Sequence, residues 1–268
     1  MVGVASLSPL NYRDRQSQLT HLFPSESSTS APAPASGPCE RDPVLSILSI
    51  PNPCSHPRSD VADQFPSAEV TGIDISPIQP AWVPPNLRFE IDDAQLPWTY
   101  PPDHFDFVHI RNLHGAISDW PSLYREAFRC TQPGGYLEHV EFNIRTLSDI
   151  APEDHIYFRW NALFAEAGER MGRTFQIYDQ MRGHIADAGY VDVVTHMWKV
   201  PIGGWAKNPR LKNVGLYTLM FLDQSVEGFA LYMLKNVMGW EFVEIQVLIA
   251  QIREAWRQWR RWQPYYEM

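Results

Sequence analysis

The chain has 268 residues, of which 44% are hydrophobic, so it is long enough and apolar enough to bury a substantial core. These values exclude disorder along its whole length. Its formal net charge is −9, which excludes the surplus of positive charge that attracts nucleic acid or an anionic membrane. We therefore expect neither a nucleic acid nor a membrane as a partner.

Cysteine usage and the first residues bear on the compartment. The three cysteines, Cys39, Cys54 and Cys130, are too few and too scattered for a disulfide framework or a zinc site. The N-terminal residues lack the cationic start and apolar core of a secretory signal, and no run of about 18 apolar residues occurs elsewhere. We expect a soluble protein without a metal, in the cytoplasm, with the nucleus as the alternative compartment.

The beginning of the chain differs in composition from the rest. Nine of the 23 prolines lie in the first 60 residues, whereas all ten tryptophans lie at or after Trp82. A stretch rich in Ser, Pro and Ala buries too little apolar surface to offset the entropy lost on ordering. We expect residues 1–43 to be flexible and residues 44–268 to form the folded domain.

The next part of the chain alternates strand and helix patterns. The apolar run VLSILSI at 44–50 has the length of a strand and ends at Pro51, and residues 121–132 have helical spacing with a proline in the first turn. Gly134 and Gly135 are predicted to end that helix. Four further strands are expected at 69–75, 87–93, 105–110 and 136–142. This alternation predicts an α/β fold with a parallel sheet.

The C-terminal half is predicted to be mainly helical. Helices are expected at 153–172, 178–188, 211–238 and 241–262, with one strand at 191–202. Segment 211–238 is apolar on most faces, which favours core packing, although it could also line a binding pocket. Arginines and tryptophans alternate in 253–262; we interpret this as an amphipathic helix with a solvated Arg face and not as a nucleic-acid or membrane patch.

Acidic residues follow two of the predicted strands. Asp74 ends the strand 69–75, and an acid at the carboxyl end of a strand in an open α/β sheet can accept hydrogen bonds from ribose hydroxyls. The alternative is a capping or turn aspartate, because Ser76 follows directly. Asp92 and Asp93 end the next strand, where one could contact a purine amino group while the other caps the loop. Glu138 and Glu141 are predicted to point to opposite faces and thus not to form a carboxylate pair.

Three segments carry a resemblance to a known family: VADQFPSAEVTGIDISPIQPAWVPPNLRFEIDDAQLPWTY, HFDFVHIRNLHGAISDWPSLYREAF and PGGYLEHVEF. Over about residues 60–255 the chain resembles the fungal LaeA-like family of S-adenosylmethionine-dependent methyltransferases. The resemblance implies a class I Rossmann-like sheet with a helical cap at 207–262. It also implies S-adenosylmethionine as methyl donor and a small-molecule acceptor in fungal secondary metabolism.

The resemblance assigns the cofactor-binding residues. Asp74 matches the acid that holds the ribose, and Asp93, with Ala94 behind it, matches the acid near the adenine; Asp92 is the alternative to Asp93. Arg111 follows at the cofactor edge.

The resemblance also implies that Arg111 and His114 lie where the methyl group and the acceptor meet. His114 is the one side chain there that could act as a base at neutral pH. The alternative is a loop histidine with a structural role, because methyl transfer often needs positioning more than a base.

The sequence departs from the family at two places. The family's first strand runs into a G-x-G-x-G loop, whereas here no glycine lies between Gly37 and Gly72, and prolines provide neither positive φ nor an amide donor. The family's aromatic-rich final strand corresponds only to the short WQPYYEM. We therefore expect the first and last strands to be degraded or missing.

The alternative function is a catalytically impaired regulatory or scaffolding protein of a secondary-metabolite cluster, with a regulatory protein as its partner.

Overall fold

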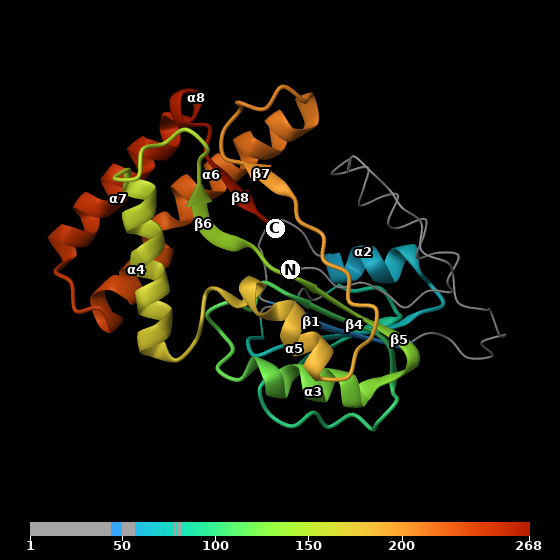
Figure 1. Cartoon of the computed structure of the whole chain (residues 1–268). Helices are drawn as coiled ribbons and strands as arrows, with labels where there is room; N and C mark the ends of the chain where they lie inside the picture. Colours follow the sequence, from blue (N-terminus) through green and yellow to red (C-terminus); the bar gives the residue numbers. More distant parts are fainter. Residues whose placement is uncertain (1–43, 50–56, 78, 80–81) are drawn as a thin grey trace. The chain divides into compact units, whose positions relative to one another are not determined.

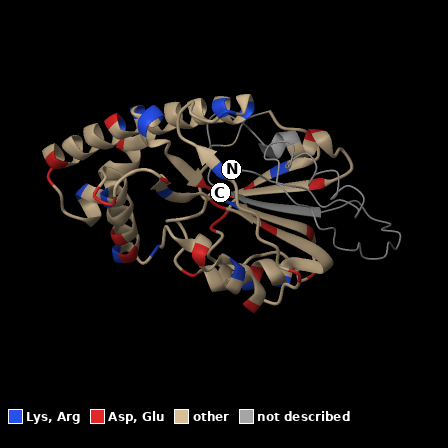
Figure 2. Cartoon of the chain, turned by 45° about the horizontal axis from the view of Figure 1, so that its top comes forward, with Lys and Arg blue, Asp and Glu red and all other residues tan. Residues whose placement is uncertain are grey.

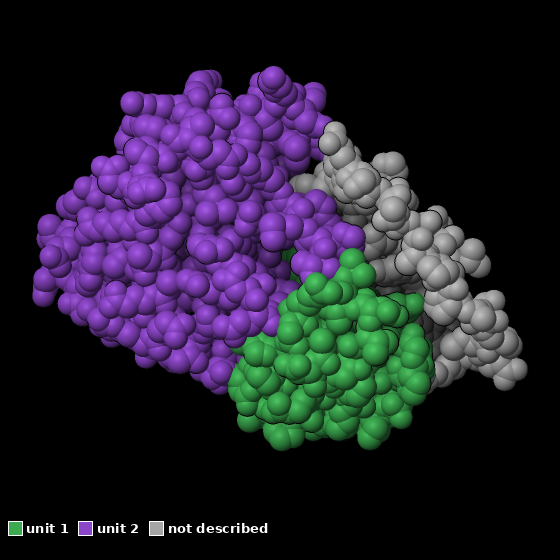
Figure 3. Space-filling view, in the orientation of Figure 1, with its two compact units in different colours: residues 1–113, 119–140, 182–194 green, residues 114–118, 141–181, 195–268 purple. Residues whose placement is uncertain are grey.

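The computed structural model describes residues 44–49, 57–77, 79 and 82–268, which divide into two compact units (Figure 3). Unit 1 contains residues up to Leu113 together with 119–140 and 182–194. Unit 2 contains 114–118, 141–181 and 195–268. The segment 1–43, expected to be flexible, lies outside the described residues, as does the 50–56 loop.

Unit 1 is built on a five-stranded parallel sheet with the order β3-β2-β1-β4-β5. The strands are β1 (Val44–Ser49), β2 (Glu69–Asp74), β3 (Leu87–Ile91), β4 (Phe105–Arg111) and β5 (Thr131–Val140). β4 is buried along nearly its whole length, as expected of a strand covered on both faces. The predicted α/β fold with a parallel sheet is confirmed.

β1 corrects the expectation that the first strand is degraded or missing. It lies in the centre of the sheet and pairs with β2 from Val44↔Glu69 to Leu48↔Ile73, and with β4 from Leu45↔Phe107 to Ser49↔Arg111. A short apolar, β-branched run is sufficient for a strand that has a partner on both sides.

Helices cover both faces of this sheet. α2 (Pro57–Gln64) connects β1 to β2, and α3 (Trp120–Cys130) connects β4 to β5; Figure 1 shows them on opposite faces. This follows from right-handed crossovers that run in opposite directions from the centre of the sheet. Asp119 caps α3 by accepting a hydrogen bond from the Ser122 N–H at 2.9 Å. A third helix, α5 (Met181–Asp187), is followed by Gly189, whose φ of 116° agrees with the expected end of the helix.

The boundary between α3 and β5 differs from the prediction. α3 ends at Cys130, and β5 begins at Thr131, so Gly134 and Gly135 lie inside the strand. Phe105 pairs with Thr131 and Phe107 with Tyr136, which places a register shift at the two glycines. The prediction that they form the turn between helix and strand is wrong, because the extra residues bulge within the pairing.

Unit 2 contains a small antiparallel sheet with the order β6-β8-β7. β6 (Asn143–Leu147) and β7 (Lys199–Pro201) flank β8 (Tyr265–Glu267), in which Tyr265 and Tyr266 are buried. The last strand, expected to be degraded or missing, is present as this short aromatic strand, which pairs outside the five-stranded sheet. The predicted strand 191–202 is reduced to β7, and its earlier apolar residues Val191 and Met197 are exposed.

The helices of unit 2 pack around an aromatic core. They are α4 (Ile156–Met171), η1 (Ile177–Asp179), α6 (Pro209–Leu231), the π-helical η2 (Tyr232–Val237), α7 (Phe242–Arg257) and α8 (Trp259–Trp262). Trp160 of α4 meets Trp256 of α7 edge to face at 5.7 Å, and the Trp256 indole N–H donates to Thr146 Oγ1 at 3.3 Å. The predicted helix 241–262 is interrupted at Gln258, between the end of α7 at Arg257 and the start of α8 at Trp259.

The long helix α6 has one buried and one exposed apolar face. Leu222, Val226 and Ala230 are buried, which agrees with core packing, whereas Tyr217 and Phe221 are exposed. At its polar edge, Asp223 pairs with Arg257 of α7 at 2.9 Å and with Arg253 at 3.7 Å. Figure 2 shows acidic and basic residues interspersed along the helices. No helix in the described part of the chain has both the length and the apolar character needed to span a bilayer.

Two glycines of α6 provide a matched test of this packing. A Cβ at Gly215 would collide with the carbonyl oxygen of Gly203, whose N–H donates to the Gly215 carbonyl at 2.7 Å, whereas a Cβ at Gly228 would meet nothing within 4 Å. We predict that Gly215→Ala lowers the free energy of unfolding by about 1–3 kcal/mol through overpacking. Gly228→Ala should raise it by about 0.5–1 kcal/mol through helix propensity. Urea denaturation checks both, and equal effects would contradict the packing described.

Candidate functional site

The candidate site starts from the carboxyl edge of the unit 1 sheet. All five strands are parallel, so their carboxyl ends share one edge, and the strand order reverses between β1 and β4. In open α/β sheets, ligands bind outside the carboxyl ends at such a switch point. The β1 loop at this point, residues 50–56, lies outside the described residues. The loops after β3 and β4 can be described throughout, and the loop after β2 can be described except at residues 78, 80 and 81.

Asp74 is the last residue of β2, and its side chain is buried, with 8% exposure. Its Oδ1 accepts a hydrogen bond from the Ser76 N–H at 3.0 Å, which is the turn contact expected for an aspartate before Ser76. Ile75, which follows, is 67% exposed. The edge therefore presents a carboxylate and an apolar side chain in consecutive positions.

The acids after β3 lie beside Asp74. The Asp92 N–H donates to the Asp74 carbonyl at 3.1 Å, so the two loops are joined directly. Asp92 Oδ1 accepts from the Asp93 N–H at 2.8 Å, and Asp93 Oδ1 accepts from the Gln95 N–H at 3.0 Å. Both acids thus stabilise the turn, whereas the sequence suggested this for one of them. Ala94, like both acids, is half-buried.

The end of β4 carries Arg111 and a constrained turn. Arg111 is half-buried and pairs in register with Ser49 of β1 and Val140 of β5, so it lies on the central strands at the switch point. Asn112 has a φ of 54° and donates its N–H to the Val140 carbonyl at 3.3 Å. A left-handed non-glycine residue here ends the strand sharply.

Two histidines that follow each other closely in the chain pair with two glutamates. In unit 1, the fully buried His109 contacts Glu138, its register partner on β5, at 2.8 Å between Nδ1 and Oε2. Burial lowers the pKa of His109 below its ordinary value and outweighs the opposing effect of Glu138, while Arg111 lowers it further. His109 is therefore a neutral core histidine.

The second pair lies in unit 2. His114 Nδ1 is 2.6 Å from Glu141 Oε2; the Glu141 side chain is fully buried, whereas that of His114 is 21% exposed. Gly115 has a φ of 72°, and a Cβ there would collide with the Phe175 ring, so the backbone beside His114 is closely packed. Glu141 is not identified from the sequence as the partner of His114, because it is considered there only as a possible carboxylate pair with Glu138.

The two sets of residues suit different chemistry. A carboxylate at Asp74, next to apolar Ile75 and the acids after β3, fits the hydroxyls and the base of a nucleoside. A buried carboxylate that accepts the Nδ1 proton of His114 leaves Nε2 as the basic nitrogen. No group of three His, Cys, Asp or Glu side chains suited to a metal ion occurs among the residues that the structure describes.

Comparison with known proteins gives a methyltransferase-domain family and relatives named as methyltransferases or as secondary metabolism regulators. A family model described as a methyltransferase domain matches residues 57–195, slightly more than half of the chain. The methyltransferase pytC of Aspergillus terreus is 36% identical over 199 residues, covering 72% of this chain and 60% of that protein. The secondary metabolism regulator LAE1 of Cochliobolus heterostrophus is 32% identical over 186 residues, covering 68% and 61%.

A further relative and a solved structure complete the comparison. The secondary metabolism regulator laeA of Monascus pilosus is 30% identical over 198 residues, covering 72% of this chain and 54% of that protein. The chain spans between 54% and 61% of the length of these three relatives. Phosphoethanolamine N-methyltransferase 2 of Haemonchus contortus, solved with S-adenosyl-L-methionine, aligns with a TM-score of 0.49 at 14% identity, covering 97% of this chain and 52% of that one.

The buried His109 predicts a pH dependence of stability. Because its pKa is lowered in the folded state, the unfolded state binds more protons below the ordinary histidine pKa of about 6.5. The stability contributed by the neutral ring is thus present above that pH and is lost as the pH falls below it. We predict that the wild type loses more free energy of unfolding between pH 7.5 and pH 5 than His109→Gln, as measured by urea denaturation. Equal losses would show that His109 does not carry this dependence.

Proposed function

The chain belongs to the methyltransferase-domain family and resembles its LaeA-like fungal members, and we propose that it transfers a methyl group from S-adenosylmethionine to a small molecule of secondary metabolism. The observation that carries the proposal is the junction of the β2 and β3 loops, where the Asp92 N–H donates to the Asp74 carbonyl. We infer a cytoplasmic protein, with the nucleus as the alternative compartment.

In this proposal the nucleoside lies at the carboxyl edge of unit 1. Asp74 accepts hydrogen bonds from the ribose hydroxyls, and its buried carboxylate makes these bonds strong because little water competes. Asp93 and Ala94, with Asp92 as the alternative to Asp93, contact the adenine, and exposed Ile75 supplies apolar surface for the ring. Arg111, at the end of β4, faces the cofactor at this edge.

The chemistry needs an electrophilic methyl group and a nucleophile that can lose a proton. S-Adenosylmethionine, when bound, supplies the methyl group from its sulfonium sulfur. For a hydroxyl acceptor, the proton that the acceptor loses on methylation would pass to His114 Nε2. Glu141, held 2.6 Å from Nδ1, orients the ring and stabilises the imidazolium that forms. In the alternative, His114 has a structural role only, and the rate of methyl transfer comes from the positioning of the acceptor against the methyl group.

A second candidate function is a regulatory or scaffolding member that has lost the cofactor and binds a regulatory protein. Two observations favour it: the sequence between Gly37 and Gly72 contains no glycine, and two of the relatives are named as secondary metabolism regulators. This candidate predicts a folded protein that does not bind the cofactor.

The nucleoside site predicts a loss of affinity in Asp74→Asn. The amide retains an oxygen for the Ser76 N–H, so the turn is preserved, but the charged acceptor is lost. We expect about 10-fold to 100-fold weaker binding of S-adenosylhomocysteine by calorimetry. Asp63→Asn, at an exposed position of α2, is the control and should leave the affinity unchanged. A folded wild type that does not bind the compound at millimolar concentration would favour the regulatory candidate.

The proton-accepting role predicts a loss of rate without a loss of affinity. Turnover of S-adenosylmethionine to S-adenosylhomocysteine is measured with a panel of phenol, amine and carboxylic acid acceptors. For any acceptor that supports turnover, we expect His114→Asn to lower kcat by about 100-fold or more, and Glu141→Gln to lower it less. Affinity for S-adenosylhomocysteine should be unchanged in both. Retention of kcat in His114→Asn would assign His114 the structural role instead.

A further inference from the structure

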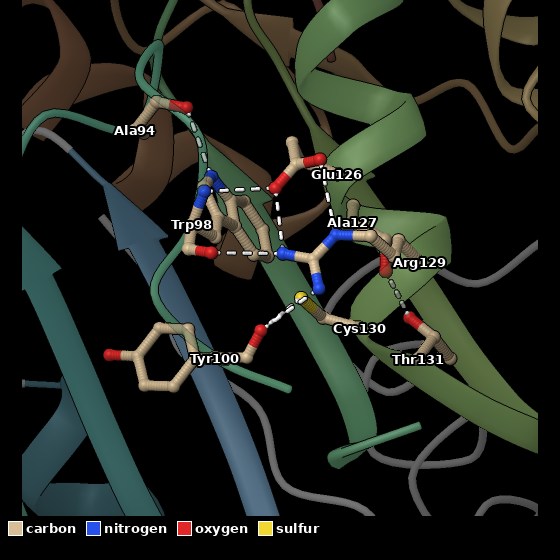
Figure 4. Close-up of polar contacts among 8 residues, drawn as sticks. All are labelled: Ala94, Trp98, Tyr100, Glu126, Ala127, Arg129, Cys130 and Thr131. Carbon is tan, nitrogen blue, oxygen red and sulfur yellow. Dashed lines mark hydrogen bonds and ion pairs between the residues drawn. The ribbon is translucent and has the colours of Figure 1, made fainter. Parts of the chain in front are cut away.

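A polar network in unit 1 connects α3 to the segment that carries Asp93 and Ala94 (Figure 4). Glu126 and Arg129 lie one turn apart on α3 and form an ion pair at 2.8 Å. Glu126 Oε2 accepts the Trp98 N–H at 2.8 Å, and Arg129 Nη2 donates to the Trp98 carbonyl at 2.9 Å. Both backbone polar groups of Trp98 are therefore held by side chains of the same helix.

Arg129 extends this contact along the loop. Its Nη1 donates to the Tyr100 carbonyl at 2.9 Å, while its own carbonyl accepts the Asp103 N–H at 3.1 Å. The guanidinium thus bridges two loop carbonyls and a carboxylate, a geometry that suits the planar fork of arginine and that a lysine ammonium cannot reproduce. We call Glu126 and Arg129 the α3 clamp.

The contacts continue from the clamp to the candidate cofactor residues. The Trp98 side chain is 7% exposed, and its indole N–H donates to the Ala94 carbonyl at 3.0 Å. Ala94 follows Asp93, whose side chain and carbonyl accept the N–H groups of Gln95 and Leu96, each at 3.0 Å. A continuous series of hydrogen bonds therefore runs from α3 through Trp98 to the turn at Asp93.

The clamp is strengthened by charge. The hydrogen bond from Arg129 holds the pKa of Glu126 below its ordinary value, and burial opposes this only in part, so the carboxylate stays ionised. Charge-assisted hydrogen bonds to a backbone are stronger than neutral ones. Residues 92–104 between β3 and β4 form neither helix nor strand, so their backbone groups lack regular hydrogen-bond partners. The side chains of Glu126 and Arg129 supply such partners at Trp98 and Tyr100.

We propose that Glu126 and Arg129 are positioning residues for the adenosine end of the cofactor site, acting through Trp98 on Asp93 and Ala94. The inference rests on the proposed function, because it assigns Asp93 and Ala94 to the adenine. The clamp keeps these two residues in their binding conformation before the ligand arrives, which reduces the entropy lost on binding.

The experiment uses the whole chain and two variants that break the series at different points. Arg129→Lys keeps the charge but loses the bridge between the Trp98 and Tyr100 carbonyls. Trp98→Phe removes the indole donor to Ala94, together with part of the buried ring, and leaves the clamp itself unchanged. Affinity for S-adenosylhomocysteine and for methylthioadenosine, which lacks the amino-acid end, is measured by calorimetry. Hydrogen exchange of the Gln95 and Leu96 amides, measured without ligand, reports the turn directly.

Two control variants separate positioning from general stability. Arg125→Lys changes an exposed arginine of the same helix that contacts Ser122. Asn86→Ala removes hydrogen bonds to the carbonyls of Ala62, Phe65 and Ala68, at the amino end of β3, and should lower the stability of unit 1. Thermal unfolding of all variants shows how much stability each has lost.

We expect Arg129→Lys to bind both compounds about tenfold more weakly and Trp98→Phe about threefold more weakly, the effect of losing one or two hydrogen bonds. Amide exchange at Gln95 and Leu96 should be faster in both, while both controls keep the wild-type affinity. Unchanged affinity or exchange in Arg129→Lys would overturn the proposal, as would an equal loss in Asn86→Ala. If the wild type binds neither compound, the proposed function fails and the assignment to a cofactor fails with it; the exchange measurement then decides separately whether the clamp fixes the turn.

Discussion

Parallel pairing of β1 with both β2 and β4 is the constraint on which unit 1 depends. It brings the carboxyl ends of all five strands to one edge, so that residues separated by tens of positions in the chain become neighbours there. It also sets the crossovers that put α2 and α3 on opposite faces. From that arrangement α3 can reach the loop after β3, and the acids after β2 and β3 can meet.

Much of this architecture could be predicted from local patterns. β2 and β4 are short runs of mostly buried residues, and β3 alternates apolar and charged residues. The acids after β2 and β3 are predicted at the carboxyl edge from these patterns alone. The boundaries that failed depend on distant partners. β8 forms because residues 265–267 pair with 199–201 and with β6, and the Gly134–Gly135 bulge exists because β4 offers fewer residues than β5 at that point. No local pattern contains that information.

The two histidine–glutamate pairs differ in which partner is shielded from solvent. In the His109 pair the imidazole is 1% exposed and the carboxylate 32%; in the His114 pair the values are 21% and 0%. Burial lowers the pKa of the shielded His109 ring, whereas His114, the base in the proposed reaction, is the partially exposed member of its pair. In the sequence, each histidine precedes its glutamate by a similar number of residues. Only the fold shows which member of each pair is buried.

The position of β8 has a consequence for synthesis of the protein. β6 and β7 pair with β8 and not with each other, so the central strand of this sheet is translated more than a hundred residues after β6. While the ribosome is still adding α6 and α7, both flanking strands have open edges, which is the condition under which nascent chains aggregate. The β6-β8-β7 sheet can therefore assemble only after β8 has been synthesised, later than the helices α6 and α7 that lie between β7 and β8 in the chain.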